Sequence, residues 1–427
     1  MPRTLGSKKV SPPAFWIFFA IFVLPLVIKF NWSNARDSAV YANALSMLIN
    51  GENPYESRTF RAGLFGSSLF FLISRLTPDF MEAAVFIILG ISGLVLFIST
   101  ISSIKYRMYD LFALVVIVWS STNRESLSTI QITGLLLALT SISIFSINKF
   151  YVDQNKAFLF VGSIAAALAI DLKPHLVLPT LILVLFVRRC YEFLGVTSLI
   201  WLLAHLVIDL LSGRSWTLEW LKLLLGLASS SPGTTRSDLI GFWSIVSTIF
   251  GDNYLLNIFP YIIILIALAL SLRMRFIGNE KIMILGFSLS LFTTYTHYYD
   301  YVPIIAICVM TLLDRESDFL HYCFLGIIML SQNVESVEGL LLALGVLVAF
   351  LTLNFDLEDY VSLFIEGRKL LCGVAAFLIL HWFIDYFTTK GFTESSISAF
   401  CVLMLCWVVF IRTQNASIKS LNQPKFI

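Results

Sequence analysis

Charge is the first thing that this sequence lacks. Of its 427 residues only 13% are charged and 58% are hydrophobic, against about 25% charged and 45–50% apolar residues in an average soluble domain. A composition this apolar excludes an intrinsically disordered chain. The net charge of +2 gives no reason to expect a nucleic acid or another polyanion as a partner. The apolar excess lies in long runs, which predicts a membrane protein with several crossings.

Cysteine is scarce too, and its spacing is not that of a metal or disulfide site. Six cysteines occur in 427 residues, most of them inside apolar runs and no two of them in Cys-x-x-Cys spacing. This pattern argues against a structural zinc site and a disulfide framework, and it predicts small buried hydrophobic residues. Walker, Gly-rich nucleotide-binding and His-Glu-x-x-His motifs are absent as well, so nothing in the sequence calls for a cofactor or a metal.

Fourteen apolar runs are candidates for membrane crossings, which predicts an all-α polytopic protein with about 12–14 transmembrane helices. The runs cover residues 14–30, 83–104, 109–121, 127–147, 157–171, 175–187, 194–211, 254–272, 282–296, 302–313, 319–331, 338–354, 371–387 and 396–411. Several are shorter than the ~20 residues that a spanning helix needs. Such runs are typical of broken helices or of helices extended by polar residues that face a cavity.

The distribution of basic residues sets the expected orientation. If the N-terminus is cytoplasmic and the first run is a retained signal anchor, 18 basic residues fall inside and 11 outside. Most of the outside ones lie in two long segments, about 31–82 and 212–253, where the positive-inside rule has little force. We therefore expect both termini in the cytoplasm and both long segments on the outer face.

Helices are also predicted within these outer segments. Apolar residues at helical spacing from Asp37 to Ile49 predict a helix, which Asn50-Gly51 should stop before a turn at Asn53-Pro54. The amphipathic stretches Leu64 to Leu76 and Trp216 to Leu227 are expected to lie in the plane of the membrane interface.

Charged and polar residues at the membrane boundary are functional candidates, because burying them there costs free energy unless they are paired or solvated. The set expected on the outer face is Arg36, Asp37, Glu52, Glu56, Arg124, Glu125, Asp171, Lys173, His175, Arg236, Asp238, His297 and Asp300. Asp37 has the chemistry of a general base toward a hydroxyl group, and it equally suits a helix N-cap or a partner for Arg36. An outer cavity lined with these groups would suit a substrate with a lipid tail and an anionic head.

Two dense polar stretches have competing interpretations. In Asp171-Leu172-Lys173-Pro174-His175 the Lys and His could bind a phosphate, or Lys173 could simply extend its ammonium group to the interface. In Thr296-His297-Tyr298-Tyr299-Asp300-Tyr301 an aromatic belt would explain the tyrosines but not His297 with Asp300. Gln131 is more typical of a hydrogen bond between helices than of a substrate contact. The acidic run at 356–359 is interpreted as a solvated turn on the inner side.

Several of these stretches resemble one family of enzymes. Asp37-Ser38-Ala39-Val40-Tyr41-Ala42-Asn43-Ala44 and Asn50-Gly51-Glu52-Asn53-Pro54-Tyr55 are similar to the first outer loop of glycosyltransferase family 87. Gln131 resembles the family's Gln-containing helix, Leu172-Lys173-Pro174 its Lys-Pro helix end, and His297 to Tyr301 its later His/Asp/Tyr motif. The proline-rich stretch that the family has after the first loop is replaced here by residues 60–70 without proline.

The resemblance implies a GT-C-like fold and a defined reaction. The family moves a sugar, a mannose-like hexose or a pentose, from a polyprenyl-phosphate donor to a hydroxyl of a glycolipid or glycan, with inversion. On this resemblance Asp37 is the catalytic base, and the substrate-binding candidates are Arg36, Tyr41, Asn53, Tyr55, Gln131, Lys173, His175, His297 and Asp300. One base suffices, because a phosphate leaves as an anion that nearby positive charge stabilises, unlike in glycosidases with paired carboxylates.

The expected organisation follows from the topology and the resemblance. It comprises a cytoplasmic N-terminus at 1–13, a catalytic transmembrane module at 14–313, C-terminal transmembrane helices at 314–411 and a cytoplasmic tail at 412–427. We expect a multi-pass protein of a bacterial cytoplasmic membrane with its active site facing outside, in contact with membrane lipids. Two alternatives stay open: a transporter or flippase for lipid-linked sugars, and a non-catalytic partner in glycan assembly.

Overall fold

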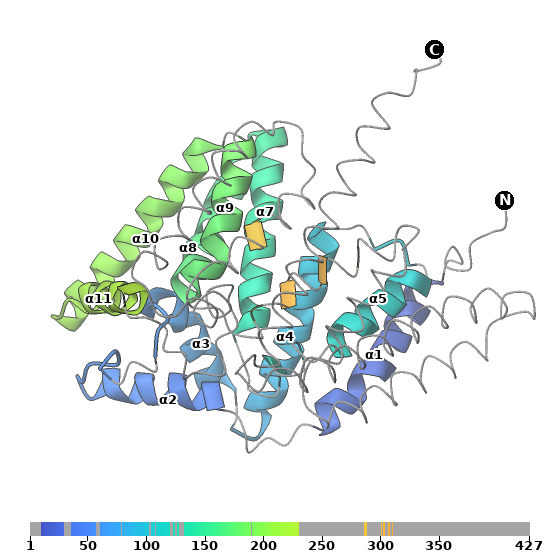
Figure 1. Ribbon diagram of the computed structural model, residues 1–427, viewed down its shortest axis with the longest axis horizontal. Helices are drawn as coiled ribbons and strands as arrows, with labels where there is room; N and C mark the ends of the chain where they lie inside the picture. The colour runs from blue at the N-terminus through green and yellow to red at the C-terminus, as the bar shows by residue number, and fades with distance from the viewer. Residues whose placement is uncertain are drawn as a thin grey trace, which may run out of the picture. The chain divides into compact units, whose positions relative to one another are not determined.

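The part of the chain that the structure describes is entirely helical where it is regular (Figure 1). The computed structural model describes residues 10–29, 36–56, 60–77, 79–101, 104–106, 108–119, 123, 126–127, 132–188, 190–229, 286–287, 300, 302–303, 306–307 and 310. The chain divides into two compact units, one formed by residues 1–25, 104–124 and 304–427 and the other by residues 26–103 and 125–303.

The first unit contains most of α1 (Pro12–Lys29) together with α5 (Met108–Trp119). The turn before α5 anchors the start of α1, since Val10 N donates to Tyr106 O at 2.8 Å and the rings of Phe15 and Tyr106 meet edge to face at 5.5 Å. Asp110 accepts from Lys105 N at 2.9 Å and so fixes the turn that leads into α5.

The second unit is a helical bundle with smaller helices at one end. Its helices are α2 (Arg36–Ile49), α3 (Leu64–Leu76), α4 (Asp79–Ile101), α7 (Thr133–Asp153), α8 (Lys156–Leu172), α9 (Pro174–Arg188), α10 (Tyr191–Ser212) and α11 (Trp216–Ser229). α8 lies at the centre, in contact with α3, α7, α9 and α10, and α7 also packs against α4. In Figure 1 α7, α8, α9 and α10 stand side by side, while α2 and α11 lie near their lower ends.

Three helices of the described residues are long and apolar enough to cross a membrane, namely Ala84–Ile101 within α4, Thr133–Asp153 and Tyr191–Ser212. This agrees with a membrane-associated helical protein. Of these, α10 is the most peripheral, because only 11% of its apolar stretch is buried. Its outward face carries exposed large apolar side chains, which are Leu199, Leu202, Leu203, Leu206, Val207, Leu210 and Leu211.

Small residues let the central helices approach closely. Where α4 crosses α7, a Cβ atom added to Gly93 would lie 1.9 Å from Gly134 O, and one added to Gly134 would lie 2.1 Å from the Cα atom of Gly90. α8 buries a series of glycine, serine and alanine residues against its neighbours. The hydroxyl groups of Thr140, Ser141 and Ser143 on α7 donate to carbonyls one turn earlier, so buried α7 leaves these polar atoms satisfied.

The helices predicted in the outer segments are confirmed within a few residues. α3 has the predicted bounds, Leu64–Leu76, and α2 ends at Ile49 before Gly51, whose φ of +72° is the left-handed conformation that favours glycine. α11 begins at the predicted Trp216. The run predicted at 127–147 is shifted, because α7 begins at Thr133 and continues to Asp153, which pairs with Lys149 at 3.7 Å. The runs predicted after residue 230 lie outside the described helices.

Candidate functional site

A lysine, a histidine and an aspartate from distant parts of the chain meet at one end of the second unit. Lys173 Nζ lies 2.6 Å from Asp300 Oδ1, and His175 Nε2 lies 3.6 Å from Asp300 Oδ2. Asp300 is fully buried, whereas the side chains of Lys173 and His175 keep 11% and 22% of their surface exposed. The site therefore presents two nitrogen groups on either side of one buried carboxylate, and we call these three residues the Lys173 cluster.

The sequence around Lys173 explains why the cluster forms at this place. Proline lacks the N–H that a helix interior needs and restricts the residue before it, so α8 ends at Leu172 and Lys173 has non-helical backbone angles of φ −147° and ψ 79°. Pro174 then begins α9, where its fixed φ suits the first helical position. This confirms the predicted helix end, and Lys173 lies at the break between α8 and α9.

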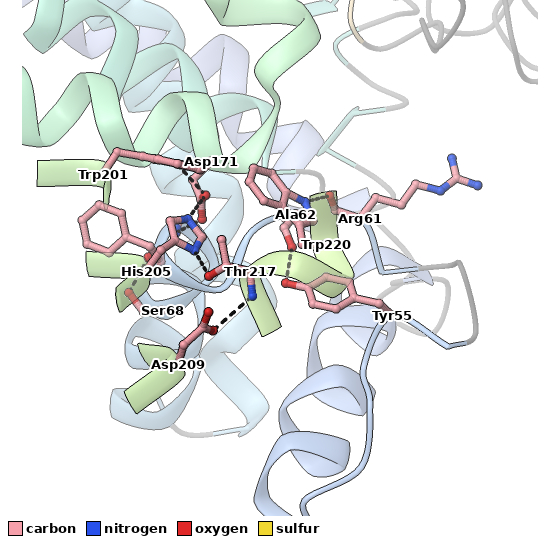
Figure 2. A network of polar contacts seen from close by, with 12 residues as sticks. Tyr55, Arg61, Ala62, Ser68, Asp171, Trp201, His205, Asp209, Thr217 and Trp220 are labelled. Atoms are coloured by element: carbon pink, nitrogen blue, oxygen red, sulfur yellow. Dashed lines mark hydrogen bonds and ion pairs between the residues drawn. The ribbon is translucent and has the colours of Figure 1, made fainter. Parts of the chain in front are cut away.

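Asp171 is buried beside this helix end and is fully engaged in hydrogen bonds (Figure 2). Its Oδ1 accepts from Trp201 Nε1 at 3.1 Å and lies 2.7 Å from His205 Nε2, and its Oδ2 accepts from Gly66 N at 2.7 Å. Its backbone carbonyl accepts from Gly63 N at 2.8 Å. Asp171 therefore joins α8 to α10 and to the N-terminus of α3, as buried carboxylates must be hydrogen-bonded.

His205 uses both of its ring nitrogens. Because a carboxylate only accepts hydrogen bonds, Nε2 carries the hydrogen toward Asp171, and in the neutral ring Nδ1 accepts from Thr217 Oγ1, 2.9 Å away. Thr217 N in turn donates to Asp209 Oδ1 at 3.1 Å. The chain of contacts from Asp171 through His205 to Thr217 thus connects the end of α8 to the start of α11.

Two tryptophans pack against His205, in the middle of this chain of hydrogen bonds. The rings of His205 and Trp220 are nearly parallel, with an interplanar angle of 8° and centroids 5.6 Å apart, and Trp201 lies 4.4 Å from His205 on a tilted plane. Trp220 Nε1 donates to Arg61 O at 2.8 Å. Figure 2 shows Trp220 between the histidine and the segment of Arg61 and Ala62, so α11 covers the network and holds the loop before α3.

The loop between α2 and α3 is fixed by turns and aromatic packing. Asn53 Oδ1 accepts from Tyr55 N at 3.0 Å, which confirms the predicted turn. The buried Tyr55 hydroxyl donates to Ala62 O at 3.3 Å, and its ring stacks on Phe60 at 5.5 Å. Burial, followed by the negative charges of Asp171 and Asp209 and by Tyr41, raises the pKa of the Tyr55 hydroxyl well above its ordinary range. Tyr55 is therefore a neutral hydrogen-bond donor at physiological pH.

The predicted site residues fall into three groups. Lys173, His175 and Asp300 are brought together. Tyr41, Asn53 and Tyr55 lie in the α2 to α3 region, where Tyr41 packs against Phe70 with ring centroids 4.5 Å apart. Arg36 and Asp37 begin α2, but their side chains, like Gln131 and His297 altogether, lie outside what the structure describes.

Sequence reasoning missed His205 and the tryptophans around it. His205 is an ionisable residue in the middle of an apolar run predicted to cross the membrane, with Asp209 one turn further along, and such a residue marks a functional or structural polar site. Cys190 is buried, which confirms the cysteine prediction at that position. Among the described residues no group of three or more His, Cys, Asp or Glu side chains is arranged to hold a metal ion.

Comparison with known proteins identifies no relative: no protein-family model, no curated protein and no solved structure matches this chain.

Proposed function

We propose that this protein is a multi-pass membrane glycosyltransferase. It moves a mannose-like hexose or a pentose from a polyprenyl-phosphate donor to a hydroxyl of a glycolipid or glycan on the outer face, with inversion at the anomeric carbon. Asp37 is the general base in this proposal, and the Lys173 cluster faces the donor phosphate. The bacterial cytoplasmic membrane is its proposed location, and GT-C-like its proposed fold.

One observation carries the proposal. Two of the stretches that resemble family 87, the Lys-Pro helix end and the His/Tyr/Asp motif, are 127 residues apart in sequence and meet in the salt bridge between Lys173 and Asp300. An ammonium group and an imidazole beside one carboxylate suit a phosphate whose negative charge grows as it leaves. The buried carboxylate of Asp300 holds the lysine in place.

The proposed step balances with the groups that the chain supplies. The acceptor oxygen attacks the anomeric carbon as the bond from that carbon to the phosphate oxygen breaks, and the electron pair stays on the phosphate. The acceptor proton passes to the carboxylate of Asp37. α2, which begins one residue before Asp37, packs against α3, and α3 packs against α8, so the base and the Lys173 cluster belong to contiguous helices of one unit.

The test is transfer by the purified protein, given a panel of polyprenyl-phosphate sugars and membrane-extract acceptors, with products identified by mass. Asp37→Asn should lower transfer by at least ~10²-fold, the usual contribution of general-base catalysis, without loss of folded protein. Lys173→Ala and His297→Ala should raise the KM for the donor more than that for the acceptor. Lys222→Ala is the matched control, since Lys222 is exposed on α11 and pairs with Glu219.

Three results would count against the proposal. Full transfer by the Asp37→Asn variant would remove the base, and equal effects of Lys173→Ala on donor and acceptor KM would remove the phosphate role. Movement of labelled sugar-lipid across vesicles without a new glycosidic bond would favour a transporter instead.

A further inference from the structure

We propose that His205 is a positioning residue for the donor site. Through Asp171 it holds the helix end that carries Lys173, and through the same carboxylate it holds the N-terminus of α3. This inference rests on the proposed function for its substrate, and on the hydrogen bonds of the described residues for its mechanism.

A short path of contacts leads from His205 to Lys173. His205 Nε2 donates to Asp171 Oδ1 at 2.7 Å, and Asp171 precedes Lys173 by two residues at the end of α8. This helix end has no continuing helix to fix it, because Pro174 starts a new one. The bonds of Asp171 to α10 and α3 therefore set where the Lys173 ammonium lies relative to Asp300.

The carboxylate of Asp171 also fixes the first outer segment. Gly66 N donates to Asp171 Oδ2 and Gly63 N to the Asp171 carbonyl. A Cβ atom added to Gly63 would lie 2.2 Å from the Asp171 carboxyl, so the backbone passes directly over this group. α3 in turn supports α2, which carries Asp37. One buried histidine–aspartate pair thus connects the proposed phosphate site to the segment of the proposed base.

The polar contact between His205 and Asp171 is a costly way to stabilise α10. α10 otherwise presents leucines to its surroundings, and a buried ion pair or polar pair contributes little to stability compared with apolar packing. An apolar residue at position 205 could still stack on Trp220, as His205 does. What an apolar residue could not do is donate to Asp171 and accept from Thr217 at once, and this directional role is what we assign to His205.

Two substitutions separate the hydrogen bond from the packing. His205→Phe keeps a ring against Trp220 and loses both polar contacts, whereas His205→Gln keeps a side-chain N–H that can donate to Asp171. We expect His205→Phe to raise the donor KM about tenfold with little change in the acceptor KM. A change of this size lies within the usual coupling between residues in contact. His205→Gln should bring the donor KM most of the way back to that of the unmodified protein. Thr197→Val, an isosteric change at a buried position of the same helix, is the control.

A double-mutant cycle tests whether the effect passes through Lys173. If it does, His205→Phe should change the donor KM less than about twofold in a Lys173→Ala background, because coupled sites are not additive. Additive effects of the two substitutions, or equal changes in donor and acceptor KM, would overturn the positioning role.

Hydrogen exchange gives a readout that does not depend on activity. In His205→Phe we expect faster amide exchange in peptides covering residues 60–68 and 172–177, no change in these peptides in Thr197→Val, and an intermediate rate in His205→Gln. Unchanged exchange of these peptides in His205→Phe would overturn the inference. If the unmodified protein transfers no sugar at all, the proposed function fails, and exchange still decides whether His205 holds the two segments.

Discussion

The Lys173 ammonium lies 2.6 Å from the carboxylate of Asp300, a residue 127 positions further along the chain. The Asp300 side chain has no exposed surface and that of Lys173 has little. Each charge is therefore removed from water and depends on a small number of neighbours, which include His175 for Asp300. Removing one partner of such a pair costs much more than removing both.

The first prediction concerns this pair. Lys173→Ala should lower the free energy of unfolding by about 3–5 kcal/mol, because it removes the ammonium group that lies 2.6 Å from the buried carboxylate of Asp300. Adding Asp300→Ala should restore part of the loss. Denaturant unfolding in detergent measures both, and Lys222→Ala, at a pair that is mostly exposed, should change stability little. A double variant less stable than the Lys173→Ala variant would show that the pair is not coupled in this way.

The second prediction concerns the crossing of α4 and α7. Gly93→Ala places a methyl group 1.9 Å from the carbonyl oxygen of Gly134, and backbone cannot move aside as a side chain can, so we expect a loss of about 1–3 kcal/mol or more. Gly195→Ala in α10 has open space around the new methyl group and should be neutral or stabilising by up to about 1 kcal/mol from helix propensity.

Thermal unfolding of both glycine variants checks the opposite signs. The comparison holds the chemistry of the substitution constant and changes only its surroundings. Equal effects at the two positions would mean that helix propensity, rather than the close crossing, decides stability there.

The third prediction is a pH dependence from Tyr55. Its pKa is raised in the folded protein, chiefly by burial, so above pH 10 the unfolded chain loses the Tyr55 proton while the folded protein keeps it. The contribution of Tyr55 to the free energy of unfolding is therefore fully present below pH 10. It falls as the pH rises further, by about 1.4 kcal/mol per pH unit. Tyr55→Phe cannot ionise and removes this slope.

Urea unfolding of the two proteins between pH 9 and pH 11 provides the measurement. The other tyrosines ionise in both proteins, so their contribution cancels in the difference. The stability advantage of the unmodified protein over Tyr55→Phe should be constant up to pH 10 and then shrink. A constant difference across the whole range would show that Tyr55 ionises normally in the folded state.

The fourth prediction concerns the backbone that passes over Asp171. Gly63→Ala would bring a methyl group to 2.2 Å from the Asp171 carboxyl, so the loop or the carboxylate must shift and the bonds from Gly63 N and Gly66 N must lengthen. We expect a loss of about 1–3 kcal/mol, together with faster exchange of the Gly66 amide. Intact protection of that amide in the variant would contradict the proposed contact.

Local signals predicted the ends of helices well. Asn50-Gly51 stops α2 and Lys173-Pro174 separates α8 from α9, because glycine and proline act on the backbone within one or two residues. The start of α7 was wrong by six residues, and its end by as many. Hydropathy does not mark a helix end that follows the polar residues Asn148 and Lys149 and closes with an ion pair between Lys149 and Asp153.

Long-range partners were only partly predictable. The outer-face assignment placed Lys173, His175 and Asp300 in one set, but the pairing of Lys173 with Asp300 depends on how two distant segments pack. His205 was overlooked because most of its run, 194–211, is apolar, and its partner Asp171 was interpreted only as part of a surface stretch. The role of Trp220 depends on the position of α11 against the loop at Arg61, which no local pattern encodes.

The polar contact of His205 also has a consequence for biogenesis. A helix such as α10 would enter the bilayer with an imidazole that hydrocarbon solvates poorly. During synthesis α8 emerges from the ribosome first, so Asp171 is already available when α10 leaves the insertion machinery. In the multi-pass protein proposed above, the order of helices along the chain supplies the acceptor before the donor, so Asp171 would be available to His205 when α10 packs beside α8.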